Sequence, residues 1–76
     1  MKEAIYERNL YQGDLKSKVI VVTKESNGFA VWVDHWNAEE NEMELVALHY
    51  SGFNQREGAI EAAVAITNRF REEGWK

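Results

Sequence analysis

Two residue types are missing from this sequence: its 76 residues include no cysteine and no proline. Without cysteine there is no disulfide, no thiolate nucleophile and no cysteine-based zinc site. The five glycines are scattered, and none belongs to a phosphate-cradling loop. No apolar run approaches the length of a membrane span, and no signal-peptide pattern opens the sequence, so we expect a cytoplasmic protein without membrane contact.

Length and composition indicate one small globular domain over residues 1–76. Hydrophobic residues make up 45% and charged residues 29%, a balance that is typical of a folded chain. A domain of this size buries only about 60% of its unfolded surface, which leaves little room for a cofactor cleft beside the core. Catalysis needs a base beside an activated nucleophile in a pocket that excludes water. We therefore expect no enzyme activity, no cofactor and no metal.

Negative charge is concentrated in one segment of the chain. The net charge is −4, and residues 25–44 contain no lysine or arginine but hold Glu25, Asp34, Glu39, Glu40, Glu42 and Glu44. Such a run is either a solvated loop or a negative patch that attracts a basic partner. Direct nucleic-acid binding is not expected, because phosphate binding depends on lysine and arginine.

Two runs rich in β-branched and aromatic residues predict a β-hairpin over residues 19–24 and 29–36. Asn27-Gly28 lies between them, and this dipeptide is a strong signal for a two-residue type I′ turn. With these two residues as the loop, Val22 would pair with Val33. One face of the hairpin would carry Ile20, Val22, Phe29, Val31 and Val33, and the other Val19, Val21, Thr23, Ala30, Trp32, Asp34 and Trp36.

The remaining segments predict a third antiparallel strand over residues 42–50 and a helix over residues 55–73. Asn54 fits the N-cap, with Glu57 as the second half of a capping box. Gly74 fits the left-handed position after the helix, which would fold Trp75 back on Phe70. Residues 2–12 fit a strand and a helix about equally. The expected fold is α+β: an antiparallel sheet of three strands, or four with residues 2–12, and one long C-terminal helix packed on one face.

Trp32 and Trp36 are the main candidates for a binding surface. The helix covers one face of the sheet, so the tryptophans on the other face are either covered by the N-terminal segment or exposed as anchors for a partner. The predicted partner-binding residues are Trp32, Asp34, Trp36, Glu39, Glu40 and Glu42. A further alternative is a metal site or small enzyme that uses His35 and His49, although no spacing here is specific for zinc.

Residues 51–63 read Ser-Gly-Phe-Asn-Gln-Arg-Glu-Gly-Ala-Ile-Glu-Ala-Ala. This stretch resembles the strand-to-helix junction of HicB-type antitoxins, which implies a glycine-containing turn before a capped helix and transfers no functional residue. The order of elements is also similar to a double-stranded-RNA-binding domain, whose last helix needs a basic start that Gln55-Arg56-Glu57 does not provide. The small size, the acidity and the lack of catalytic groups resemble phage-encoded inhibitors, anti-CRISPR proteins among them.

These observations predict a small acidic, non-enzymatic binding protein. It would occlude a basic, nucleic-acid-binding surface of a larger protein, because an acidic face can take the place of phosphates. Its location would be the host cytoplasm if it is phage-encoded. The alternative is an antitoxin-like or regulatory module that forms a homodimer through the tryptophan-bearing sheet face.

Overall fold

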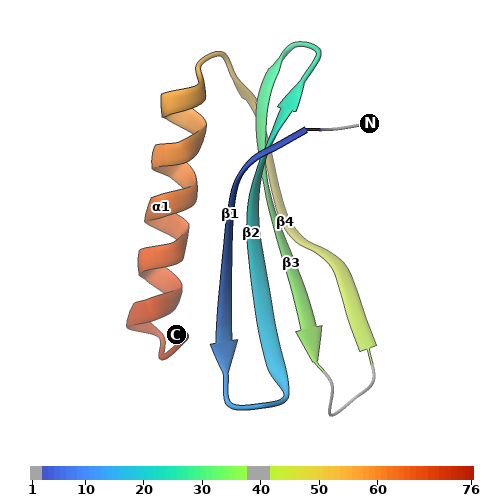
Figure 1. The fold of residues 1–76 in the computed structure, drawn as a ribbon, viewed down its shortest axis with the longest axis vertical. Helices are drawn as coiled ribbons and strands as arrows, with labels where there is room; N and C mark the ends of the chain where they lie inside the picture. The colour runs from blue at the N-terminus through green and yellow to red at the C-terminus, as the bar shows by residue number, and fades with distance from the viewer. Residues whose placement is uncertain (1–2, 38–41) are drawn as a thin grey trace.

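The computed structural model describes residues 3–37 and 42–76, and for residues 42–48 it describes the backbone alone. Four strands precede one helix: β1 Glu3–Gln12, β2 Lys16–Glu25, β3 Gly28–Asn37, β4 Glu42–Phe53 and α1 Arg56–Glu72. The strands form one antiparallel sheet in the order β1-β2-β3-β4, and α1 lies along one face of it (Figure 1). This confirms the predicted α+β fold in its four-strand form. Among the described residues, no helix is both long and apolar enough to cross a bilayer.

The N-terminal segment is a strand rather than a helix. β1 pairs with β2 from Glu3 to Gln12, and this pairing makes the segment a strand. Leu10 is fully buried on the helix side, and a bulge between Ala4 and Tyr6 lets both Ile5 and Tyr6 pack against the core. β1 therefore extends the sheet at its edge and does not fold over the face that carries Trp32.

The hairpin between β2 and β3 is confirmed, but the predicted register is wrong. Glu25 pairs with Gly28 and Val22 pairs with Val31, so the two loop residues are Ser26 and Asn27. The backbone of Gly28 has φ +138°, and a Cβ added there would clash with the carbonyl oxygen of Phe53. The glycine, which is the first residue of β3, therefore permits the close approach of β4. The register error is an even number of residues, so both predicted faces of the hairpin remain correct.

The core lies between the sheet and a row of small residues on α1. Ile20, Val22, Val31 and Val33 are completely buried on the helix side of the sheet. From α1 the buried residues are Ala59, Ala63 and Thr67, spaced four apart, and Ile66 and Phe70 pack at the margin of the core. Small side chains at this spacing allow the helix to lie close to the sheet.

The C-terminal end of α1 matches the prediction, whereas its N-terminal end does not. The N-cap is Gln55, with no side-chain capping bond, so the predicted Asn54 cap and its capping box are wrong. The reason is that the helical hydrogen bonds begin one residue later, with the N–H of Ala59 donating to the carbonyl of Gln55 at 3.3 Å.

The C-terminal end of α1 forms the predicted motif. Gly74 has φ +99°, its N–H donates to the carbonyl of Arg71, and the N–H of Trp75 donates to the carbonyl of Phe70 at 3.0 Å. Trp75 is thereby buried in the core. The following residue, Lys76, exchanges two backbone hydrogen bonds with Tyr11, which ties the C-terminal end of the described chain to the edge of β1.

Candidate functional site

No described element covers the sheet face opposite α1, which is called the outer face below (Figure 1). Its centre is apolar, because the register places Val21 opposite Trp32, with Val19 and Ala30 beside this pair. Among the residues with described side chains, the pairing assigns to this face Ala4, Glu7, Asn9, Tyr11, Ser17, Val19, Val21, Thr23, Glu25, Ala30, Trp32, Asp34, Trp36 and His49. Trp36 is 38% exposed and Tyr11 55% exposed, so large aromatic side chains meet solvent here.

The basic residues of the strands are confined to one face of the sheet. The lysines and arginines of the strands all occupy positions on the helix side: Arg8, Lys16, Lys18 and Lys24. On the outer face the charged residues of the described strands are acidic: Glu7, Glu25 and Asp34. Lys18 illustrates the helix side, since its Nζ lies 4.7 Å from the centroid of the Phe70 ring and 4.8 Å from that of Trp75. The outer face is therefore both apolar and acidic.

Trp32 is held in place on this face by contacts on two sides. Its indole N–H donates a hydrogen bond to Thr23 Oγ1 at 2.9 Å, and that hydroxyl donates to Glu25 Oε1 at 3.3 Å. On the β4 side its ring stacks on His49, with the centroids 3.8 Å apart and the planes at 16°. Trp32 therefore presents a rigid, half-buried ring, which lowers the entropy lost when a partner packs against it.

Asp34 and Trp36 border a shallow hollow of about 180 Å³ further along β3. Ser17 and Val19 of β2 form its other side. Burial of the Asp34 carboxyl among these groups raises its pKa above the ordinary value of 3.8. A carboxylate that has lost part of its hydration beside an exposed indole is a favourable neighbour for a cationic group.

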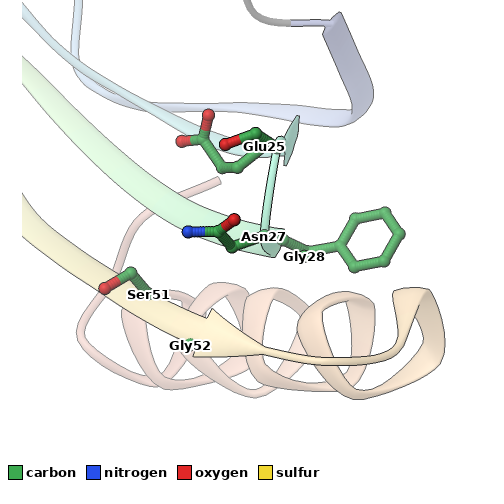
Figure 2. Close-up of a pocket in the computed structure, with 7 residues that line it drawn as sticks. Glu25, Asn27, Gly28, Ser51 and Gly52 are labelled. Atoms are coloured by element: carbon green, nitrogen blue, oxygen red, sulfur yellow. The ribbon is translucent and has the colours of Figure 1, made fainter.

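A second hollow of about 300 Å³ lies at the opposite end of the outer face, where β2 turns into β3. It is lined by residues 25–29 of the hairpin together with Ser51 and Gly52 of β4. Figure 2 shows the polar groups of Glu25, Asn27 and Ser51 directed toward the same side, while Gly28 and Gly52 contribute no side chain. Asp34 lies six residues beyond Gly28 along β3, so the two hollows are about 20 Å apart.

Three of the predicted partner-binding residues lie on this one face: Trp32, Asp34 and Trp36. Glu39 and Glu40 fall outside the described residues, and Glu42 is described only in its backbone, where it pairs with Asn37. Sequence reasoning missed Glu25, although it continues the alternation of Val21 and Thr23. It also missed the β1 residues of the face, because β1 was not assigned as a strand.

The two histidines lie on opposite faces of the sheet. His35 meets the edge of the Trp75 ring on the helix side, with the ring centroids 5.8 Å apart. His49 lies on the outer face against Trp32. They cannot ligate one metal ion together, so the alternative site that uses both histidines is wrong.

No protein-family model, curated protein or solved structure matches this chain. By its architecture, the described part of the chain is a small α+β domain with one open sheet face that is apolar and acidic.

Proposed function

We propose that this protein is a small non-enzymatic binding protein whose outer face docks on a basic surface of a larger protein. The observation that carries the proposal is the composition of the open face: it combines exposed aromatic residues with acidic groups and has no lysine or arginine in the described strands. A surface of this kind attracts cations over a distance and then buries apolar area on contact. A nucleic-acid-binding surface on the partner fits best, because such surfaces are rich in lysine and arginine.

In this proposal, the acidic and the aromatic residues of the outer face affect different rate constants of binding. Glu7, Glu25 and Asp34 would raise the association rate, since electrostatic complementarity acts mainly on encounter. Trp36 would slow dissociation, because an exposed indole that becomes buried in the centre of an interface is a typical hot spot. In this proposal the partner loses access to nucleic acid while the acidic face occupies its basic site.

Pairing of two copies through the outer face is the second candidate, and the charges of the face argue against it. A twofold axis places the same patch on both partners, so acidic groups would face a surface that is also acidic and offers no lysine or arginine. Asp34 would lose its remaining hydration without gaining a cation, which is costly. The aromatic residues favour such a pairing and the charges oppose it.

A competitive capture experiment tests the proposal. The immobilised protein is exposed to a lysate of its native host, and the retained proteins are then challenged with a short DNA or RNA duplex. We expect retention of a protein with a basic surface that the duplex releases. Trp36→Ala and Asp34→Asn should each reduce retention at least fivefold, whereas Glu61→Gln, which removes one charge from an exposed position on α1, should not. Retained proteins that are acidic, or that bind Trp36→Ala equally well, would contradict the proposal.

Sedimentation equilibrium separates the second candidate from the first. We expect a monomer at micromolar concentration. A dimer that Trp36→Ala converts to a monomer would instead favour pairing through the outer face.

A further inference from the structure

We propose that the hollow at the β2–β3 turn is a binding site for the guanidinium group of an arginine side chain. The inference rests on the proposed function, since it assigns to this hollow one arginine of the basic partner. It adds a specific site to a surface that is otherwise defined only by its general charge and apolarity.

Polar groups from separate segments converge on this hollow. Glu25 ends β2, Asn27 belongs to the turn, and Ser51 comes from β4. Their carboxylate, amide and hydroxyl groups point to the same side of the hollow (Figure 2). The close approach of β4 to the hairpin at Gly28 is what brings Ser51 beside the other two.

The chemistry of these groups suits a guanidinium ligand. The carboxylate of Glu25 accepts hydrogen bonds and carries a negative charge, and the amide oxygen of Asn27 and the hydroxyl of Ser51 add neutral acceptors. A guanidinium group is a planar cation with five N–H donors in a fixed fork, so it can use acceptors that come from different directions. An ammonium group is a point charge and makes less use of such an arrangement.

Hydrogen bonds orient Glu25 before any ligand arrives. Thr23 donates a hydrogen bond to Glu25 Oε1, and Trp32 donates to the same Thr23 hydroxyl. These two hydrogen bonds, called the relay below, hold the carboxylate at the rim of the hollow. They also connect it to Trp32 at the centre of the outer face. Preorganisation of this kind lowers the entropy cost of binding.

The glycines leave the hollow open. Gly52 has φ +90°, and no atom lies within 4 Å of the place where its Cβ would be. A larger residue at this position would be strained and would project a side chain into open space at the wall of the hollow. The volume of about 300 Å³ is ample for one guanidinium group with the end of its side chain.

The probe for this site is N-acetyl-arginine methylamide, which carries one guanidinium group and no terminal charges. Titrated into the ¹⁵N-labelled protein, it should shift the amide resonances of Gly28, Ser51 and Gly52 with a saturable, millimolar-range affinity. The citrulline analogue has the same shape without the charge and should bind at least tenfold more weakly. The lysine analogue should fall between them.

Glu25→Gln is the decisive variant. It removes the charge but keeps an oxygen that can accept the Thr23 hydrogen bond, so the fold and the relay should persist. We expect at least a tenfold loss of arginine affinity. Glu61→Gln removes an equivalent charge from an exposed position on α1, away from the hollow, and should leave the affinity unchanged.

The outcomes keep this inference apart from the proposed function. Equal binding of the citrulline analogue, unchanged affinity in Glu25→Gln, or shifts spread evenly around Glu7 and Asp34 would each overturn the guanidinium site. Host-protein capture that is lost in Trp36→Ala but kept in Glu25→Gln would overturn the assignment of a partner arginine to the hollow and leave the proposed function standing. Saturable arginine binding without any captured basic partner would support the site and contradict the proposed function.

Discussion

Replacing Ala63 by leucine tests the contact that decides which face of the sheet stays open. Ala63 is completely buried in the row of small residues through which α1 meets the sheet. Leucine adds three carbon atoms at a site with no access to solvent, so either the helix moves outward or neighbouring side chains leave their preferred rotamers. Overpacking of this kind costs about 1–3 kcal/mol.

That cost is large for this protein. A domain of 76 residues has a total stability of about 4–11 kcal/mol at typical values per residue. In a domain of this size each kcal/mol shifts the melting temperature by about 4–8 °C. We therefore expect Ala63→Leu to lower the melting temperature by roughly 4–24 °C, measured by circular dichroism at 222 nm and checked by urea denaturation.

Ala65→Leu is the matched control. It makes the same change two residues further along α1, at an exposed position, and leucine and alanine have similar helix propensities. Its effect should stay within about 0.5 kcal/mol. Equal melting temperatures for the two variants would refute the docking of α1 through its small residues, and with it the assignment of the open face.

Further predictions concern a carboxyl group, the tryptophans and a turn. Because burial raises the pKa of Asp34 above 3.8, the folded state holds its proton more tightly than the unfolded state, so this group lowers stability as the pH rises through and above that value. Asp34→Asn should thus be more stable than the parent at pH 7 in urea titrations, by a margin that shrinks toward pH 3; a margin independent of pH would count against it. In a Trp75→Phe background, acrylamide should quench Trp36 more than the remaining indole, which removal of Trp36 would verify. Gly28→Ala should lower the melting temperature more than Gly13→Ala, since both have positive φ but only Gly28 lacks space for a Cβ.

The two faces of the hairpin and the end of α1 followed from local sequence. β-branched residues alternate along residues 19–24 and 29–36, and alternation assigns faces whatever the register error, provided that the error is even. Gly74 and Trp75 predicted the end of the helix because the left-handed residue and the residue after it form hydrogen bonds within the last turn. Interactions between residues that are close in sequence can be predicted from the sequence alone.

Other features depended on contacts between segments that are distant in sequence. Residues 2–12 had an ambiguous pattern, and pairing with β2 made them a strand. Gly28 looked like a turn residue, while the carbonyl of Phe53 across the sheet gives it a further role. The buried row on α1 consists of its small residues rather than of Phe70, because close packing selects size as well as hydrophobicity.

The outer face likewise combines features set by local sequence with features set by contacts between distant segments. Trp32, Asp34 and Trp36 were placed on one face by the period of two along a single strand. The acidic segment of residues 25–44 was visible in the sequence as a run of charge. The sheet face on which each charged residue lies was not visible, because strand pairing sets that face and position in the chain does not. Glu7 precedes Glu25 by 18 residues and Asp34 follows it by 9, and only the assembled sheet brings the three onto one surface while it sends Arg8, Lys18 and Lys24 to the other.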